Sequence, residues 1–206
     1  MPCTFEHELQ LQAEGRHPVA GIDEAGRGPL AGPVVAAAVI LPPNFDGQGL
    51  DDSKRLSARA RDAHYERLTG TPGVVWSIAV IEAEVIDRLN ILRATHEAMR
   101  QAVAALPTPA IHALIDGLPV RPFPIPHTAL VGGDGLSLSI AAASVIAKVT
   151  RDRLMHAHAA TWPEFGFDRH KGYATADHLA SLRRHGPCPI HRRSFAPVAQ
   201  LSLALG

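Results

Sequence analysis

Short apolar runs bounded by glycine and proline alternate with longer stretches in which apolar residues recur at helical spacing. The short runs are rich in Val, Ile and Ala, which is typical of buried β-strands. Between the first two runs the chain has Gly-Pro turns and no helical period, which predicts a hairpin-like connection. The predicted strands cover residues 19–22, 33–41, 73–81, 111–115 and 129–131.

Helices are predicted between these strands and after the last of them. Ser57 can cap a helix with its side-chain oxygen, and Pro107 ends the helical stretch that precedes it. The pattern as a whole predicts an α/β fold. The predicted helices cover residues 58–69, one or two segments within 82–106, and 139–158, with shorter helices and loops from Trp162 onward.

Length and composition fit one globular unit. A chain of 206 residues with 46% hydrophobic content can bury a sizeable core in one domain, with or without a small appendage. No apolar run reaches the ~20 residues that a membrane span needs, and the N-terminus lacks the basic and apolar regions of a signal peptide. We therefore expect a cytoplasmic protein. Cys3 and Cys188 are far apart without CxxC spacing, so neither a disulfide framework nor a cysteine zinc site is indicated.

The formal net charge is zero, which argues against a protein that coats nucleic acid by bulk electrostatics. The basic residues nevertheless crowd the last third of the chain, so any nucleic-acid contact is expected to be local. A solvated helical face is the alternative explanation for such a cluster. Its members are Lys148, Arg151, Arg153, Arg169, Lys171, Arg183, Arg184, Arg192 and Arg193.

Acidic residues stand at or near the ends of three predicted strands. Asp23 and Glu24 directly follow the first strand, Asp116 follows the fourth, and Asp134 lies just beyond the fifth. Taken alone, the adjacent pair would be a solvated strand end and Asp134 a plain turn residue. In an open α/β sheet, however, the carboxyl ends of neighbouring strands meet in one crevice.

A crevice with these acids has the chemistry of a metal site. Four carboxylates brought together cannot all stay ionised without cations, and oxygen-only ligands favour Mg²⁺ or Mn²⁺ over zinc. Two such ions ~4 Å apart can activate a water and stabilise the leaving oxygen of a phosphodiester. The acids therefore indicate two-metal phosphodiester chemistry.

A glycine-rich turn, Gly26-Arg27-Gly28, follows the acidic pair. The segment matches a GxGxxA nucleotide-binding pattern, but Pro29 and the strand predicted from residue 33 replace the helix that a dinucleotide pyrophosphate requires. A nicotinamide enzyme is thus a distant alternative. Glycines here instead let backbone groups approach a ligand closely, and a main-chain group beside a metal site could test a sugar-phosphate backbone for a 2′-hydroxyl.

Seven short motifs together resemble bacterial type 2 ribonuclease H, the ribonuclease HII family. They follow the order of that family from about residue 21 to residue 198 and are specific in combination, although each is weak alone. The motifs are GIDEAGRGPLAGP (21–33), DSKRLS (52–57), NILRAT (90–95), IDG (115–117), AAASVIAK (141–148), HKGY (170–173) and HRRSF (191–195).

The resemblance implies an RNase H-like fold, a mixed five-stranded sheet flanked by helices, with a small helical C-terminal region. The implied catalytic domain is residues 1–158, and residues 159–206 pack on it in a single functional unit. The implied activity is endonucleolytic hydrolysis of the RNA strand of RNA/DNA hybrids and incision 5′ of single ribonucleotides in duplex DNA. The implied products carry 3′-hydroxyl and 5′-phosphate ends, and the implied cofactor is Mg²⁺ or Mn²⁺.

The same resemblance assigns roles to individual residues. It implies that the metal-binding catalytic acids are Asp23, Glu24, Asp116 and Asp134, with Asp23 as the bridging ligand. It implies that the 2′-hydroxyl is read by Gly26, Arg27 and Gly28, and that Tyr173 stacks on the deoxyribose after the ribonucleotide. Stretches that line the phosphate backbone contain Lys54, Ser144, Lys148, His170 and Lys171.

Two positions depart from the family pattern. Gly132 stands where a lysine usually precedes the Gly-Asp of the fourth acid, so substrate affinity or its salt dependence is expected to differ. Ala174 stands where glycine is common after the tyrosine, which would stiffen that loop modestly. Neither change affects the four acids.

Two further functions share part of this pattern. A noncatalytic hybrid-binding module would not need the four acids. A DDE-type recombinase or resolvase would share the metal chemistry, but the Gly26–Gly28 turn and Tyr173 favour ribose recognition.

The C-terminus carries one more motif. Gln200-Leu201-Ser202-Leu203-Ala204 resembles the short motif by which bacterial repair enzymes bind the sliding clamp, but it lacks the terminal aromatic residue. An amphipathic helix end is the alternative interpretation of this segment.

Overall fold

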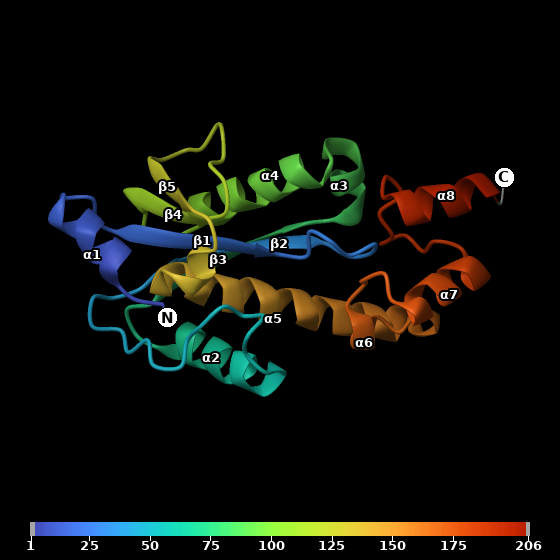
Figure 1. Ribbon diagram of the computed structural model, residues 1–206, viewed down its shortest axis with the longest axis horizontal. Coiled ribbons are helices and arrows are strands. Elements are labelled where there is room, and N and C mark those ends of the chain that lie inside the picture. Colours follow the sequence, from blue (N-terminus) through green and yellow to red (C-terminus); the bar gives the residue numbers. More distant parts are fainter. Residues whose placement is uncertain (1–2, 205–206) are drawn as a thin grey trace.

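The computed structural model describes residues 3–204, with side chains described through residue 201, and is built on one mixed sheet (Figure 1). Its strands are β1 (Val19–Ala25), β2 (Val34–Ile40), β3 (Val75–Ile81), β4 (His112–Asp116) and β5 (His127–Leu130). The strand order is β3-β2-β1-β4-β5. Strand β2 is antiparallel to β1 and β3, whereas β4 is parallel to β1 and β5. The predicted α/β fold and the turn between the first two strands are confirmed.

The helices cover both faces of the sheet. Ser57 caps the helix predicted after it, because its side chain accepts a hydrogen bond from the amide of Ala60 at 3.2 Å. The stretch 82–106 forms two helices that separate at Asn90. The helices are α1 (Glu6–Ala13), α2 (Ala58–Gly70), α3 (Ala83–Leu89), α4 (Ile91–Ala104), α5 (Leu138–Thr161), α6 (Phe167–His170), α7 (Ala176–His185) and α8 (Ala196–Ala204).

Helix α1 was not predicted. Its only buried residues are Glu8 and Leu11, so it lacks the apolar stripe that reveals a helix in sequence. Tertiary hydrogen bonds hold it instead, since the Glu8 carboxylate accepts from the hydroxyls of Ser137 and Ser139 at the start of α5.

Over residues 3–204, no helix combines the length and apolar character that crossing a bilayer would require.

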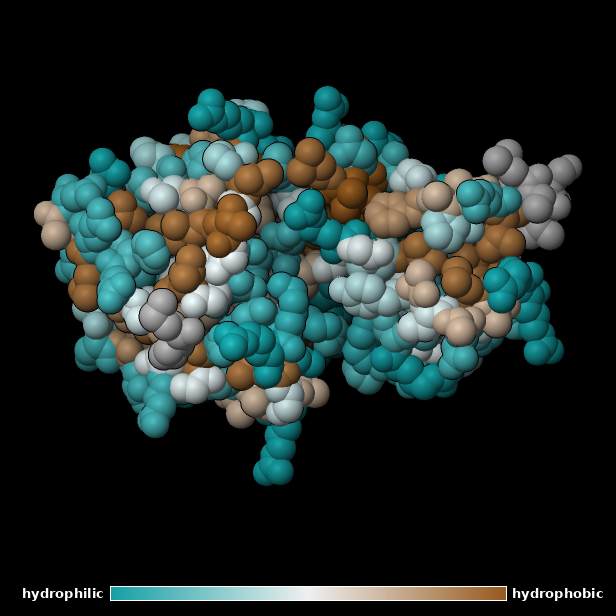
Figure 2. Space-filling model, in the orientation of Figure 1, coloured by the Kyte–Doolittle hydropathy of each residue, from teal (hydrophilic) through white to brown (hydrophobic). Residues whose placement is uncertain are grey.

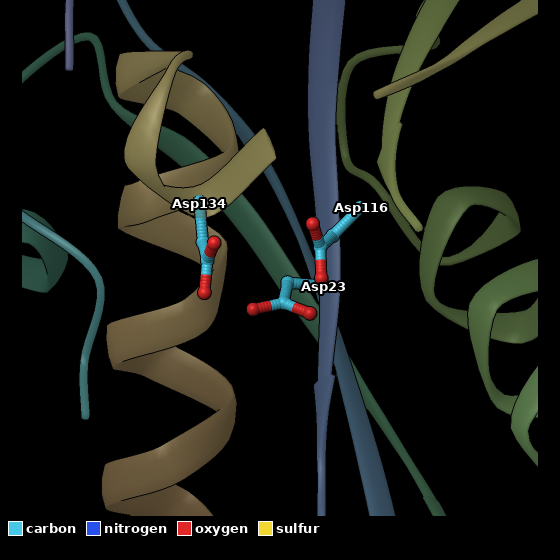
Figure 3. Close-up of side chains that lie close together, drawn as sticks. All are labelled: Asp23, Asp116 and Asp134. Atoms are coloured by element: carbon cyan, nitrogen blue, oxygen red, sulfur yellow. The ribbon is translucent and has the colours of Figure 1, made fainter. Parts of the chain in front are cut away.

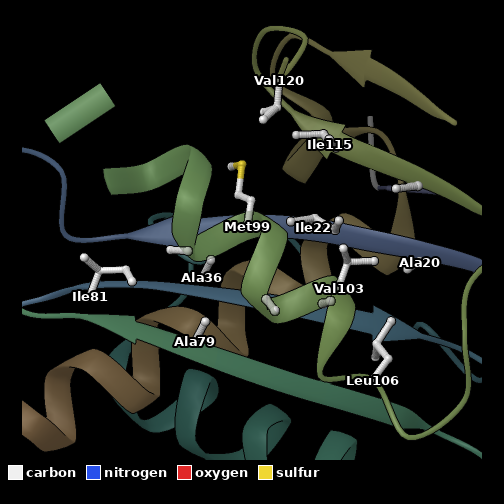
Figure 4. Close-up of a cluster of buried hydrophobic side chains, with 14 of the residues drawn as sticks. Ala20, Ile22, Ala36, Ala79, Ile81, Met99, Val103, Leu106, Ile115 and Val120 are labelled. Atoms are coloured by element: carbon white, nitrogen blue, oxygen red, sulfur yellow. The ribbon is translucent and has the colours of Figure 1, made fainter. Parts of the chain in front are cut away.

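Two apolar cores sandwich the sheet. Helix α4 covers one face, where Met99 packs with Ile22 and Ile115 (Figure 4). Helices α5 and α2 cover the other face, where Ile146 and Leu68 pack with alternate residues of β2. All seven residues of β2 are buried, which explains why this strand reads as a continuous apolar run rather than as an alternating pattern.

A close approach of α5 to β1 depends on Gly21. A Cβ atom at this position would lie 2.1 Å from the carbonyl carbon of Ser139, so no other residue fits without displacing the helix. The N-terminal end of α5 is therefore held against the strand that carries Asp23.

The C-terminal elements have a core of their own. Phe165, Phe167 and Leu182 pack with Leu30, which follows the glycine turn, and with Met155 of α5. Figure 1 shows α6, α7 and α8 gathered at one end of α5, far from α1. This core fixes the C-terminal region against the loop that joins β1 to β2.

Candidate active site

Three aspartates from different elements converge at one edge of the sheet. Asp23 lies on β1, Asp116 ends the neighbouring parallel strand β4, and Asp134 lies in a 3₁₀ turn, Gly133–Gly135, just before α5. One carboxylate oxygen from each lies within 4.8 Å of the others, and Figure 3 shows these carboxylates pointing toward one another. The expected crevice at the carboxyl ends of neighbouring strands is thus present.

The end of the first strand was predicted incorrectly. Strand β1 continues through both acids to Ala25, because its backbone pairs with β2 as far as Val35. Asp134 lies beyond the end of β5, as predicted. A hydrogen bond of 2.7 Å from the Gly133 amide to the Asp116 carboxylate ties this turn to β4, which brings Asp134 to the other acids.

Glu24 lies outside the group formed by the three aspartates. Neighbouring residues of a strand point to opposite faces, and the Glu24 carboxylate accepts a hydrogen bond of 3.2 Å from the guanidinium of Arg27. Glu24 still lines the same cleft as Asp23 and Asp116. Its carboxylate is therefore close enough to the site to contribute charge there.

Burial and repulsion between charges disfavour the ionised forms of Asp23, Glu24 and Asp134. Burial raises the pKa of Asp23 well above its ordinary value, and the charges of Glu24 and Asp116 raise it further. Burial also raises the pKa of Glu24, although Arg27 opposes this effect. The pKa of Asp134 is raised by burial and then by the charge of Asp116. Cation binding would relieve this repulsion and release protons.

The donor set fits a hard divalent cation. The three converging side chains offer carboxylate oxygens only, which are the ligands that Mg²⁺ and Mn²⁺ prefer, whereas zinc prefers nitrogen and sulfur. Within residues 3–204, no other group of three or more His, Cys, Asp or Glu side chains comes together in this way. The predicted metal-binding character of the acids is therefore consistent with their geometry.

Asp23, Glu24 and Asp116 line a cleft of about 250 Å³ that also includes the glycine turn and Tyr173. Gly28 and Tyr173 face each other, because a Cβ atom on Gly28 would lie 3.6 Å from Cε1 of the tyrosine. Tyr173 is 46% exposed. Figure 2 shows a hollow between the part of the molecule built on the sheet and the C-terminal helices.

The glycine turn does not form a dinucleotide site. It leads into β2, which runs antiparallel to β1, and no helix begins at the turn. A pyrophosphate would therefore find no helix N-terminus there. The structure thus removes the nicotinamide alternative.

The predicted phosphate-contacting residues fall into two groups. Lys54 and Lys148 line the cleft, and Lys148 also lines an adjoining groove of about 660 Å³ that contains Lys171. Ser144 also lines the cleft, and both Ser144 and His170 make internal hydrogen bonds. The hydroxyl of the buried Ser144 donates to Ser53 at 2.7 Å, and the two ring nitrogens of His170 contact the Phe165 carbonyl and the Gly172 amide.

Sequence reasoning missed two residues beside the site. Arg151 and Arg192 belong to the basic cluster for which a solvated face was considered, but both are buried and hydrogen-bond to main-chain carbonyls of the loop between β1 and β2. For Arg151 the signal was present, because it lies one helical turn beyond Ala147 and so continues the buried face of α5.

Comparison with known proteins identifies the family. The model of the Ribonuclease HII family matches residues 20–198. The Ribonuclease HII of Syntrophotalea carbinolica is 51% identical over 199 residues, which are 97% of this chain and 94% of that protein.

Solved structures share the fold. The PCNA:RNase HII complex from Archaeoglobus fulgidus matches with a TM-score of 0.75 and 25% identity, over 89% of this chain and 96% of that chain. Bst-RNase HIII in complex with Mn²⁺ matches with a TM-score of 0.72 and 19% identity, over 91% of this chain and 69% of that chain, and shows likeness of fold alone. The fold is thus RNase H-like, and the chain belongs to the ribonuclease HII family.

Proposed function

We propose that this protein incises duplex DNA on the 5′ side of a single embedded ribonucleotide, in addition to the hydrolysis of RNA in RNA/DNA hybrids that characterises its family. The products would carry 3′-hydroxyl and 5′-phosphate ends. One observation carries the proposal: two of the three converging aspartates, Asp23 and Asp116, share a cleft with a glycine turn that faces an exposed tyrosine.

The acids would hold the catalytic cation. Asp23, Asp116 and Asp134 would bind Mg²⁺ or Mn²⁺, with Asp23 as the bridging ligand and Glu24 contributing from the same cleft. Two bound ions would supply activation of the attacking water and charge stabilisation of the leaving oxygen. Bst-RNase HIII, which has the same fold, was solved in complex with Mn²⁺, and this supports a divalent ion here.

The turn and the tyrosine would recognise the junction from RNA to DNA. Gly26, Arg27 and Gly28 present main-chain groups to the cleft, where a 2′-hydroxyl could bond to them. The Tyr173 ring would pack against the next sugar, which fits best when that sugar lacks a 2′-hydroxyl. A single ribonucleotide followed by DNA satisfies both contacts at once.

Basic side chains would position the strand. Lys54, Lys148 and Lys171 line the cleft and its adjoining groove, where they can contact phosphates. Ser144 lines the cleft beside them, and His170 would act from behind this surface, through the neighbours to which it hydrogen-bonds. The proposed role in the cytoplasm is removal of misincorporated ribonucleotides and clearance of RNA primers.

A weak contact with a sliding clamp is a further part of the proposal. Helix α8 contains Gln200–Ala204, although side chains after Leu201 lie outside the described residues. The Archaeoglobus fulgidus RNase HII, which shares this fold, was solved with PCNA. Deletion of residues 200–206 should then abolish capture by immobilised bacterial clamp, and unchanged capture would remove this part.

Asparagine variants of two acids test the catalytic assignment. Asp23→Asn and Asp116→Asn keep the side-chain shape but remove charge, so cleavage of a labelled hybrid should be lost while binding to it survives. Glu84→Gln, an exposed acid on α3, is the matched control and should cleave normally. Full turnover by both asparagine variants would refute the assignment.

A further inference from the structure

Two buried arginines lie behind the glycine turn without an acidic partner. Arg192 is 0% exposed and Arg151 is 1% exposed. Neither side chain has a carboxylate within 4.0 Å in the part of the chain that the structure describes. Burial lowers the pKa of Arg151 to about 10, and burial with the nearby Arg151 charge lowers the pKa of Arg192 to about 9. Burying two such charges is costly.

The hydrogen bonds of these arginines all go to main-chain carbonyls. Arg192 donates from Nε to Gly32 at 2.9 Å, and from its two terminal nitrogens to Arg27 at 2.9 Å and Gly26 at 2.6 Å. Arg151 donates to Pro33 at 2.9 Å and to Ala31 at 3.1 Å. Together they hold the loop between β1 and β2 at both of its ends.

Gly26 makes this arrangement possible. Its φ of +98° favours glycine, and a Cβ atom there would lie 2.1 Å from Nε of Arg151. The turn therefore needs glycine partly because a buried guanidinium lies directly against its backbone.

Peptide geometry turns these bonds into a constraint on two amides. The cis peptide bonds of the described chain precede Pro18 and Pro122, so the peptides around Arg27 are trans. A planar trans peptide points its carbonyl and its amide in opposite directions. Since Arg192 holds the carbonyls of Gly26 and Arg27, the amides of Arg27 and Gly28 point away from it, and both residues line the catalytic cleft.

We infer that Arg192 is a positioning residue that sets the direction of the Arg27 and Gly28 amides and thereby the discrimination between ribose and deoxyribose. The inference rests on the proposed function, because it requires the turn to read the 2′-oxygen. A guanidinium on the carbonyl side also polarises each peptide, which makes its amide a stronger donor. The C-terminal region thus takes part in sugar recognition without touching the substrate.

Packing around Arg192 fixes its side chain. The guanidinium lies over the ring of Phe195, 5.1 Å from the ring centre, and the Arg192 amide donates to the Leu30 carbonyl at 2.8 Å. The side chain and backbone of one residue therefore both bond to the same loop. This double attachment keeps the guanidinium in one place relative to the turn.

The test compares two substrates rather than one rate. Single-turnover cleavage is measured on duplexes that carry either one ribonucleotide or one 2′-fluoro nucleotide, which is a much weaker partner for the amides. The variants are Arg192→Met, which loses the three donors, and Arg192→Lys, which keeps the charge but cannot hold both peptides. Arg193→Ala is the matched control, because Arg193 is the exposed neighbour. Circular dichroism and Mn²⁺ affinity confirm that each variant is folded.

Cleavage at the ribonucleotide should fall about 10- to 100-fold in the methionine variant, because a misplacement of about 1 Å of groups that position the substrate lowers the rate by up to about 100-fold. Cleavage of the 2′-fluoro duplex should fall much less, so the ratio of the two rates collapses, with the lysine variant intermediate and the alanine control unchanged. Equal losses on both substrates would show that Arg192 only supports the fold and would overturn the inference. If the wild-type protein cut both duplexes equally, the proposed reading of the 2′-oxygen would itself be wrong.

Discussion

The ammonium group of Lys54 lies 3.4 Å from a carboxylate oxygen of Asp134, 80 residues away in sequence. The acids of the site raise the pKa of Lys54 even though its partial burial alone would lower it. The Lys54 side chain is 76% exposed, so this contact contributes little to stability. Its position at the rim of an acidic cleft instead places a cation where both a metal ion and a phosphate would arrive.

Replacement of Lys54 should therefore have opposite effects on two ligands. Lys54→Gln removes a positive charge beside the acids, so Mn²⁺ should bind a few-fold more tightly in calorimetry. The same change should weaken substrate binding and reduce the slope of log affinity against log salt by about 0.9, because one phosphate contact is lost. Arg55→Gln, an exposed neighbour, is the control. Weaker metal binding by the Lys54 variant would contradict this account.

Gly132 offers a gain-of-contact experiment. Its φ is +70° and no atom lies within 4 Å of a Cβ atom built there, so a lysine has space but costs about 1 kcal/mol of unfolding free energy. We expect Gly132→Lys to bind substrate more tightly at low salt, with a steeper salt dependence. Gly132→Ala separates charge from backbone strain and should lose the same stability without this gain. Identical binding by the two variants would show that position 132 does not reach a phosphate.

Tyr173 should matter most at a junction. A base stacked on an aromatic ring contributes about 1–3 kcal/mol, and we expect the sugar packed on Tyr173 to contribute in the same range. Tyr173→Ala should therefore reduce incision at a single ribonucleotide by about 10- to 100-fold. Cleavage inside a long RNA tract should change much less. Tyr173→Phe keeps the ring and should retain most of the activity. Equal losses on both substrates would argue against junction recognition.

A buried histidine pair predicts loss of stability in acid. A carbonyl oxygen can only accept, so His178 Nδ1 donates to the Tyr173 carbonyl at 2.8 Å. In the neutral ring the other nitrogen, Nε2, then accepts from Nε2 of His191 at 3.0 Å. His191 Nδ1 then accepts from the Cys188 amide at 3.0 Å, and this chain of bonds needs both rings neutral. Burial and the neighbouring His178 lower the pKa of His191 from 6.5 to about 4.

Because the folded state holds His191 neutral, its contribution to stability is present above pH 6.5 and is lost as the pH falls toward 4. Between pH 7 and pH 5 this group alone should cost about 2 kcal/mol of unfolding free energy. Urea denaturation of the wild-type protein and of His191→Gln measures the effect, and the variant should show the shallower pH dependence. His185→Gln, on an exposed ring, should follow the wild type. If the free energy of unfolding changed with pH by the same amount in all three proteins, the proposal that both histidines are neutral would be refuted.

Local patterns were sufficient to predict most of the fold. The five strands and the long helix were predicted from apolar runs and helical periods, and Ser57 caps the N-terminus of α2 as expected. Helix α1 was missed because a buried Glu8, rather than an apolar stripe, attaches it to α5. The end of β1 was misplaced because pairing with β2 overrides the preference of two acids for a turn.

The site was only partly predictable. Asp23, Asp116 and Asp134 could be grouped because parallel strands bring their ends together. The separation of Glu24 from that group follows from strand alternation once β1 is known to continue. Arg192 could not be assigned from sequence, because its partners are main-chain carbonyls more than 150 residues away. Every residue has a main-chain carbonyl, so such partners leave no pattern in the sequence.

The central claim is tested most directly with a labelled DNA duplex that contains one ribonucleotide. The protein is incubated with it in Mg²⁺, in Mn²⁺ and in chelator, beside an all-DNA duplex and a continuous RNA/DNA hybrid. We predict metal-dependent incision immediately 5′ of the ribonucleotide, a 3′-hydroxyl at the cut, and an intact DNA control. Cleavage of the continuous hybrid alone would contradict the proposed recognition of a single ribonucleotide, and binding without cleavage of either substrate would contradict the catalytic role of the acids.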